Sequence, residues 1–465
     1  NKVVLNGNTK TSDHVVMREI RTLPGQKFNK SAIIRTVREL STIGYFNPEK
    51  ITPNPQPRPD GTVDIEYNVV EKPSDQIELS GGFGGGRVVG TLGLTFNNFS
   101  TKNFFKKGAW APLPGGDGQR VSLRLQTNGK FYRGYSFSFT EPWLGGKKPV
   151  QFSTSLSYSK QFLNDFATGQ VDRSKSFNIL TASIGLAKRL TVPDDSFVLS
   201  NSISFQYYDL NNYNTGLFTF GNGASRNFAY TIGLSRNNKG VNPIFPTYGS
   251  EFSVSAKFTP PFSLFNKIDY ANLGKLAEYK LTNSGAGYFD VNNNWVAPGD
   301  YIATQEINGS NYQVKADSYV EADTDQGKVD QKKFEWLEYY KIKFKADWFT
   351  KIYGKLVLRS LGEFGFLGSY NQDRGMIPFE RFFVGGDGLA NFALDGREII
   401  GLRGYPNQSL TPSDSRGAQN GATVYNKFSL ELRYPLTLKS SASIYALTFA
   451  EGGAAYDSFK NYNPF

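Results

Sequence analysis

The chain has no cysteine and only one histidine, His14, in 465 residues. Disulfides, thiolate metal sites and cysteine nucleophiles are therefore excluded, and the commonest general base of enzymes is nearly absent. No apolar run reaches the roughly 18 residues that a membrane-spanning helix needs. These absences argue against an enzyme and against a helical membrane protein, and we expect no catalytic residue, no metal and no cofactor.

Aromatic residues and glycine are abundant, with 38 Phe, 26 Tyr and 48 Gly, which is typical of β structure. The formal net charge is +11, but the basic residues are spread along the chain, which disfavours a nucleic-acid surface. Anionic lipid headgroups fit better, and Lys102, Lys106 and Lys107 share a predicted turn where they could meet a membrane or simply be solvated. Because the chain starts at Asn1 without a signal peptide, we expect a processed or trimmed chain.

Residues 1–73 combine helical and strand patterns. A short strand at 2–5 precedes a helix that Ser12 can cap and that we expect to continue to Ile20, before Pro24-Gly25. A second helix is expected at 29–43, with four apolar residues on one face at the 3.6-residue period: Ile33, Ile34, Val37 and Leu40. The N-terminal region is thus predicted to be a small α/β domain.

A Pro-rich connection at 53–59 then leads to a strand at 63–69 with alternating apolar residues. The resulting β-α-α-β-β order resembles a POTRA domain. The resemblance includes the Gly7-Asn8 turn, the Gly44-Tyr45-Phe46 exit from the second helix and the Val63-Asp64 strand.

From residue 76 to 465 the pattern changes to strict alternation with a period of two. Tyr135, Phe137 and Phe139, for example, alternate with polar residues. A barrel of so many strands encloses a lumen too wide for side chains to fill, so the apolar face must point outward into lipid. The predicted fold is mostly β, a transmembrane antiparallel β-barrel preceded by one POTRA domain. The expected strands are 77–84, 88–98, 119–128, 131–141, 149–161, 174–189, 196–210, 224–237, 248–259, 334–350, 354–367, 424–438 and 442–456.

Thirteen is an odd number, whereas bacterial single-chain barrels have an even number of strands. Either one strand is overlooked or the chain stops short of closure. Since residues 463–465 are typical of a turn, we favour the second alternative and expect 16 strands in the complete barrel. Long insertions near 260–333 and 368–423 are predicted to be external loops, and four aromatic residues are predicted to form interfacial girdles: Trp143, Tyr208, Trp336 and Trp348.

Two short motifs stand near the C-terminal end, Gly401-Leu402-Arg403-Gly404-Tyr405 in a loop and Phe449-Ala450-Glu451-Gly452-Gly453 in a strand. Phe449, Glu451 and Gly453 share one face of their strand. A loop arginine in a shielded lumen needs a carboxylate partner, although Arg403 taken alone could be solvated.

With the POTRA-like domain, these motifs resemble the BamA-like family of outer-membrane assembly factors, and the resemblance covers essentially the whole chain. In that family a V-R-G-F/Y signature docks on a wall motif of the form F-x-D-x-G. The resemblance implies a lumen latch, in which Leu402 replaces Val and Glu451 replaces Asp: Arg403, Gly404, Tyr405, Phe449, Glu451 and Gly453.

The first barrel strand is rich in glycine, which weakens strands. In the family this strand opens as a lateral gate, so the resemblance implies a gate formed by Ile77, Leu79, Gly81, Gly82, Phe83 and Gly84. The glycines could equally serve only to let the strand curve. The turn at Thr140–Trp143 is similar to a family turn signature, and a simple Pro-directed turn explains it as well.

The implied function is that of the central insertase subunit of a BAM complex. Such a subunit sits in the bacterial outer membrane with its N-terminal domain in the periplasm. Its implied partners are nascent outer-membrane proteins, accessory periplasmic or surface lipoproteins and outer-membrane lipids. The alternative is a two-partner-secretion transporter of the same superfamily. A diffusion porin would need neither a POTRA-like domain nor the paired Arg403 and Glu451 motifs, and a barrel lipase would need a histidine in the barrel.

Overall fold

The computed structural model describes most of the 465 residues. None of the helices in this described part has the length and apolarity needed to cross a bilayer. The described residues are 2–84, 87–110, 113–146, 148–164, 170–194, 196–214, 218–240, 242, 244–386, 397–413, 419–439 and 442–463.

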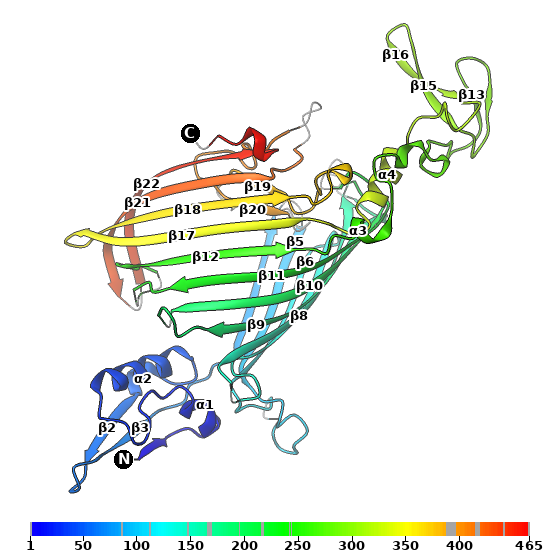
Figure 1. The fold of residues 1–465 in the computed structure, drawn as a ribbon. Helices are drawn as coiled ribbons and strands as arrows, with labels where there is room; N and C mark the ends of the chain where they lie inside the picture. The colour runs from blue at the N-terminus through cyan, green and yellow to red at the C-terminus, as the bar shows by residue number, and fades with distance from the viewer. Residues whose placement is uncertain are drawn as a thin grey trace. The chain divides into compact units, whose positions relative to one another are not determined.

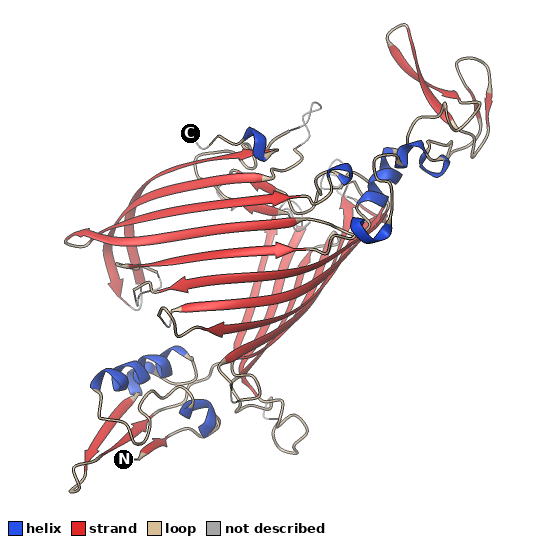
Figure 2. Ribbon diagram, in the orientation of Figure 1, coloured by secondary structure: helices blue, strands red, loops and turns tan. Residues whose placement is uncertain are grey.

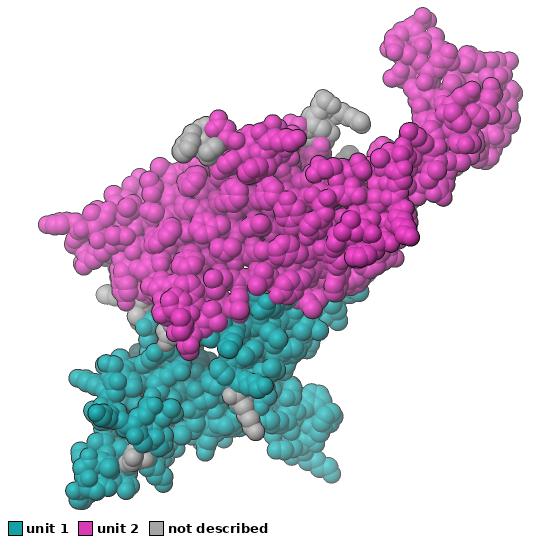
Figure 3. Space-filling model, in the orientation of Figure 1, with its two compact units in different colours: residues 1–159, 180–189, 200–202 teal, residues 160–179, 190–199, 203–465 magenta. Residues whose placement is uncertain are grey.

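The chain forms two compact units, shown in Figure 3. The first consists of residues 1–159, 180–189 and 200–202. The second consists of residues 160–179, 190–199 and 203–465. The first unit therefore contains the N-terminal domain and the early strands of the large sheet, and the second contains the later strands and the long insertions.

The N-terminal domain contains a three-stranded sheet and two helices (Figure 2). Its sheet order is β1-β3-β2, with β1 parallel and β2 antiparallel to β3. The predicted β-α-α-β-β order is confirmed. The elements are β1 (Val3–Asn6), α1 (Asp13–Met17), α2 (Lys30–Thr42), β2 (Thr52–Pro57) and β3 (Val63–Asn68).

Both helices pack apolar residues into the core of this domain, which includes Val16, Leu40 and Tyr67. Helix α1 ends at Met17 and is therefore shorter than predicted. The side chain of Ser12, at the N-cap, makes no hydrogen bond to the helix. Ile34 is 61% exposed, contrary to prediction. It lies about 100° around α2 from the buried Ile33, which places it outside the apolar face.

The Pro-rich segment predicted as a connection is instead the edge strand β2. Pro53, Pro55 and Pro57 pair with β3 at alternate positions. The N–H of Ile65 in β3 donates to the Lys2 carbonyl on the β1 side, so the residues next to Ile65 direct their backbone groups toward β2. The three prolines consequently occupy the outward positions of β2, and this free edge offers no N–H donor at any of them.

Among the described residues the large sheet has 13 strands, as predicted, and Figure 1 labels most of them. Its order is β22-β21-β18-β17-β12-β11-β10-β9-β8-β7-β6-β5-β4. Neighbouring strands are antiparallel from β4 to β7 and from β11 through β12, β17, β18 and β21 to β22. The bounds are β4 (Gln76–Gly84), β5 (Arg87–Phe99), β6 (Gln119–Asn128), β7 (Tyr132–Glu141), β8 (Val150–Asn164), β9 (Val171–Arg189), β10 (Phe197–Asn211), β11 (Gly223–Asn237), β12 (Gly249–Phe258), β17 (Tyr340–Tyr353), β18 (Leu356–Gly368), β21 (Val424–Lys439) and β22 (Ala442–Tyr456).

The polarity of the sheet is inverted relative to a soluble protein. In β21, Phe428 and Leu430 are exposed, whereas their neighbours Ser429, Glu431 and Arg433 are buried. Alternate residues of a strand point to opposite faces, so one face of β21 is apolar and exposed while its other face is polar and buried. This is the arrangement expected of strands whose outer face meets lipid.

The structure corrects the barrel prediction at the start of one strand and at one aromatic residue. Strand β17 begins at Tyr340 rather than at residue 334, because the preceding segment runs as a loop whose Leu337 and Tyr339 are buried. Tyr208 is also buried, where its ring stacks on Phe177 and Phe379. It therefore does not belong to an interfacial girdle, and it faces the opposite side of β10 from the exposed Ile203.

The two long insertions contain elements of their own. The segment between β12 and β17 carries α3 (Ser263–Asn266), β13 (Tyr288–Phe289), β14 (Trp295–Val296), β15 (Ile302–Ile307), β16 (Ser310–Lys315) and α4 (Gln326–Lys333). The segment between β18 and β21 carries β19 (Phe382–Val384) and β20 (Glu398–Ile400), which pair in parallel. An aromatic core that includes Phe382, Phe383 and Tyr425 holds the second segment against the sheet.

Candidate functional site

The candidate site centres on Arg403 in the segment between β18 and β21, which we call the 369–423 loop. Next to Arg403, Leu402 is fully buried, and its N–H donates a hydrogen bond to the Gly386 carbonyl at 2.7 Å. On the other side Gly404 has φ +88°, a left-handed conformation that favours glycine. Arg403 is therefore fixed between a buried residue and a glycine turn.

Arg403 binds Glu451 of β22 through its backbone and its side chain. The Arg403 N–H donates to Glu451 Oε2 at 2.8 Å, and Nε donates to Oε1 at 2.9 Å. Nη2 donates to the same Oε1. The Glu451 side chain is only 4% exposed, so these charge-assisted bonds form largely out of water, where they are strongest.

Glu431 of the neighbouring strand β21 is a second carboxylate partner, and its side chain is 2% exposed. It accepts a hydrogen bond from Arg403 Nη2 and one from Arg433 Nε, the latter at 2.7 Å. Arg359 Nη1 lies 3.2 Å from its Oε1. Three guanidinium groups thus converge on one buried carboxylate.

The charges of this network balance. Arg359 also binds Asp347 of β17, with Nε donating to Oδ1 at 2.8 Å and Nη2 to Oδ2 at 3.0 Å. An unpaired charge in such a place would be costly to desolvate. Three arginines therefore oppose three carboxylates, and together they form what we call the Arg403 network: Arg359, Arg403, Arg433, Asp347, Glu431 and Glu451.

Two further residues of the wall motif shape the site. The Arg403 guanidinium carbon lies 3.8 Å from the centroid of the Phe449 ring, in cation–π geometry. A Cβ at Gly453 would lie 2.6 Å from the Asn426 carbonyl oxygen, so this position has no room for a side chain. Tyr405 is exposed and, among the contacts of the described residues, takes no part in the network.

The structure thus places Arg403 against Phe449 and Glu451, as the two motifs predicted. Sequence reasoning missed Glu431 and its arginines because no short motif contains them. The sequence does contain one indication of these residues. In their strands, charged residues alternate with apolar ones, which places the charges on the polar face of the sheet. The missed residues are Asp347, Arg359, Glu431 and Arg433.

A family model described as the Omp85 superfamily domain matches residues 115–317 and 310–465. The chain belongs to the Omp85 superfamily. A second model, described as POTRA, surface antigen variable number repeat, matches residues 1–72. This Omp85 chain is therefore a POTRA domain followed by a barrel sheet, as predicted.

Curated relatives and solved structures agree with this assignment. The chain is 22% identical to the outer membrane protein assembly factor BamA of Neisseria meningitidis serogroup B, over 98% of this chain and 46% of that protein. It is 27% identical to a putative outer membrane protein assembly factor of Treponema pallidum, over 35% of this chain and 18% of that protein. The chain thus spans less than half the length of these relatives.

BamA from Haemophilus ducreyi, solved without POTRA domains 1–3, shares the fold with a TM-score of 0.52 at 16% identity, over 98% of this chain and 72% of that one. Within the Omp85 superfamily the chain is thus similar to BamA in sequence and in fold.

The predicted gate strand β4 is an edge strand of the sheet in this Omp85 chain. Ile77 and Leu79 are 77% and 81% exposed. A Cβ at Gly82 would meet no atom within 4 Å, so close packing does not explain that glycine. Phe83 and Gly84 belong to β4 by their backbone, but their side-chain surroundings lie outside the described residues.

The turn at Thr140–Trp143 contacts the POTRA domain within the first unit. Trp143 Nε1 donates to Glu19 Oε1 at 2.9 Å, and the Arg18 guanidinium lies 5.6 Å from the centroid of the Trp143 ring. Nearby, the Tyr45 hydroxyl donates to the Gly118 carbonyl, and burial raises the pKa of Tyr45 to about 12. The predicted girdle role of Trp143 is therefore wrong, since this residue joins the two parts of the first unit.

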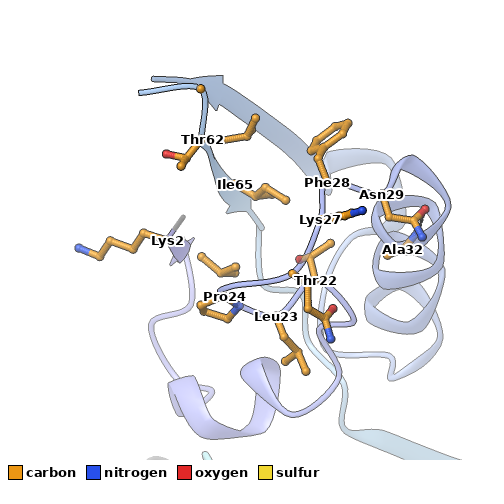
Figure 4. A pocket seen from close by; sticks show the side chains of 14 residues that line it. Lys2, Thr22, Leu23, Pro24, Lys27, Phe28, Asn29, Ala32, Thr62 and Ile65 are labelled. Atoms are coloured by element: carbon orange, nitrogen blue, oxygen red, sulfur yellow. Dashed lines mark hydrogen bonds between the residues drawn. The ribbon is translucent and has the colours of Figure 1, made fainter. Parts of the chain in front are cut away.

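A separate pocket of about 380 Å³ lies within the POTRA domain (Figure 4). Leu23 and Phe28 line it and are exposed, while Thr22 and Ile65 form part of its buried wall. Its described lining residues include no acidic residue and no histidine. Within the described residues no group of three or more histidine, aspartate or glutamate side chains is arranged to hold a metal ion.

Proposed function

We propose that this Omp85 protein folds β-barrel proteins and inserts them into a bacterial outer membrane. In this proposal its POTRA domain lies in the periplasm, where it meets unfolded substrates. The protein acts as the central subunit of an assembly complex with accessory lipoproteins. It works without covalent chemistry and without a cofactor, and its partners are nascent outer-membrane proteins and the surrounding lipids.

The observation that carries the proposal is the charged loop held against the polar face of the sheet. A pore for passive diffusion gains nothing from a buried network of three arginines and three carboxylates. Such a network fixes a loop in one position, which is useful when the barrel wall next to it must move in a defined way. The similarity to assembly factors named BamA supports the same function.

Insertion is proposed to proceed at strand β4. An edge strand presents unpaired N–H and C=O groups that can template an incoming strand by β-augmentation. Gly81 and Gly82 lie in the exposed part of this strand, and glycine lowers the stability of strand pairing there. β4 would then part from its closing partner strand and accept the first strand of a substrate.

The test is a reconstitution of the full-length protein into liposomes that contain no other membrane protein. A urea-denatured outer-membrane β-barrel protein is added outside, and its folding is followed by the heat-dependent shift of its mobility on gels. We expect folding to be at least about tenfold faster than in empty liposomes, a lowering of the barrier by roughly 1.4 kcal/mol.

The same assay separates insertion from export. An insertase leaves the folded substrate in the liposome membrane, where it resists carbonate extraction. A secretion transporter instead delivers a soluble polypeptide into the liposome lumen. Substrate in the lumen, or folding no faster than in empty liposomes, would contradict the proposed function.

A further inference from the structure

The 369–423 loop has a second set of charged contacts, separate from the Arg403 network. The Glu380 carboxylate accepts hydrogen bonds from Lys257 Nζ of β12 at 2.5 Å and from Lys341 Nζ of β17 at 3.1 Å. The Tyr339 hydroxyl donates to Glu380 Oε1 at 2.9 Å. The Glu380 side chain is 13% exposed and that of Lys341 only 5%. A loop carboxylate is thus held by the amines of two sheet strands.

Glu398, in the same loop, continues this set. Its Oε2 lies 2.6 Å from Lys341 Nζ, and its Oε1 accepts from Lys343 Nζ at 2.6 Å. Lys341 therefore bridges the two loop carboxylates. Lys341 and Lys343 are alternate residues of β17 and face the same side of the sheet.

The backbone of the loop places the two carboxylates together. β19 and β20 pair in parallel, with Phe382 opposite Glu398, and Glu380 lies two residues before Phe382. Phe382, Phe383 and Val384 are fully buried. The small parallel pair is therefore a rigid element that presents Glu380 and Glu398 to the lysines.

The polarity of this second set is the reverse of the first. At Arg403 the loop supplies the cation and strands β21 and β22 supply the anions. At Glu380 and Glu398 the loop supplies the anions and strands β12 and β17 supply the cations. Buried charges without partners are strongly disfavoured, so a loop shifted or rotated from this position would leave charges of both signs uncompensated.

We propose that Glu380 and Glu398 form a second anchor, which positions the N-terminal half of the 369–423 loop independently of Arg403. Only the role of this anchor rests on the proposed function: a loop fixed at two points would keep the inner face of the barrel in place while the gate strand opens. The positioning itself can be measured whether or not the protein inserts substrates.

The absence of native cysteine allows loop position to be read with single introduced thiols. Val384→Cys reports on the second anchor and Leu402→Cys on the Arg403 network, because both side chains are fully buried. The full-length protein is labelled with a maleimide in liposomes, and only the folded form, separated on gels by its heat-dependent mobility, is scored.

Glu380→Gln keeps the shape of the side chain and removes its charge. We expect it to speed labelling at position 384 by about tenfold and at position 402 by less than about twofold, whereas Arg403→Ala should show the opposite pattern. The matched control is Glu363→Gln in β18. Its side chain is 15% exposed and pairs with Lys345 at 3.2 Å within the sheet, so it should change neither rate.

Should Glu380→Gln yield no folded protein, Lys257→Gln gives the same test in milder form, since it removes one of the two amines at Glu380. It should raise labelling at position 384 by about threefold and leave position 402 unchanged. Labelling at the parent rate, or an equal rise at both reporters, would overturn the second anchor. A wild-type protein without insertion activity would refute the proposed function and leave this result intact.

Discussion

At the scale of single residues, the Arg403 network depends more on Glu431 than on Glu451. Glu431 faces three arginines, whereas Glu451 is paired with one arginine among the described residues, Arg403. A neutral side chain at Glu431 leaves several positive charges close together without their shared anion, and such a loss costs about 3–5 kcal/mol in buried pairs.

Glu431→Gln should therefore destabilise the barrel by about 3 kcal/mol, and Glu451→Gln by clearly less. The measurement is the urea midpoint of the heat-dependent gel shift for each variant at neutral pH. Equal midpoints for the two variants would show that the three arginines do not share Glu431 as their counter-charge.

Glu71 shows how one carboxylate can hold a turn in the POTRA domain. It accepts hydrogen bonds from the N–H groups of Thr9, Lys10 and Thr11 and from the Thr9 hydroxyl. Burial acts to raise the pKa of Glu71, but these hydrogen bonds outweigh it and bring the pKa to about 2, below the ordinary 4.5.

Because the pKa is depressed in the folded state, the stabilisation is fully present above pH 4.5 and is lost as the pH falls toward 2. Glu71→Gln should destabilise this segment by about 2 kcal/mol at pH 7 and by almost nothing near pH 2. Hydrogen exchange of residues 9–20 measures the effect, with the exposed Glu49→Gln as control. A loss of the same size at both pH values would contradict the account.

How far single residues could be predicted from the sequence depended on whether a motif marked them. Arg403, Phe449 and Glu451 lie in recognisable short motifs, and the structure places them together. Asp347, Arg359 and Glu431 come from three separate strands, and only the register of the sheet brings them together. The register of strand pairing is a property of the folded sheet, so no short sequence pattern predicts contacts between the strands of the Arg403 network.

At the scale of elements, the proline spacing of β2 closes one edge of the POTRA sheet. Its outward positions carry prolines and so present carbonyl groups without N–H donors. An incoming strand needs both donors and acceptors to pair. This edge is therefore protected against pairing with other chains, although the strand itself pairs normally with β3.

Replacing Pro53, Pro55 and Pro57 together with valine should restore three outward N–H groups and open the edge. We expect the variant to self-associate in detergent, detected as dimers or larger species by analytical ultracentrifugation, while Pro59→Val, beyond the end of β2, stays monomeric. A triple variant that sediments as the wild type does would show that the prolines do not protect this edge.

Elements with a clear period were predicted well, and those shaped by tertiary packing were not. All 13 strands of the large sheet follow from alternation, because lipid on one side and a polar interior on the other enforce a period of two. The predicted start of β17 is wrong because Phe334, Leu337 and Tyr339 are buried in the aromatic core of the second unit rather than placed by strand pairing. Helix α1 ends at Met17, since the N–H groups of Glu19 and Ile20 donate three residues back, to Val16 and Met17, rather than four.

At the scale of the whole molecule, the inverted polarity of the sheet decides the fold class. In β21 the apolar Phe428 and Leu430 are exposed on one face, whereas Glu431 and Arg433 on the other face are buried, and Glu431 is bound by Arg403 of the 369–423 loop. The sequence predicts this inversion through strand number and alternation. It does not predict the folds of the two long insertions, whose short elements depend on contacts with one another.

The most direct test of the account is the rate at which the reconstituted full-length protein folds a denatured β-barrel substrate, compared between wild type and Arg403→Ala. The control is Arg236→Ala, which breaks the Arg236–Asp194 ion pair with its 2.8 Å contact, outside the Arg403 network. The account predicts that Arg403→Ala is folded in the membrane but at least about tenfold slower in insertion, while Arg236→Ala stays within about twofold of wild type. Insertion by Arg403→Ala at the wild-type rate would contradict it.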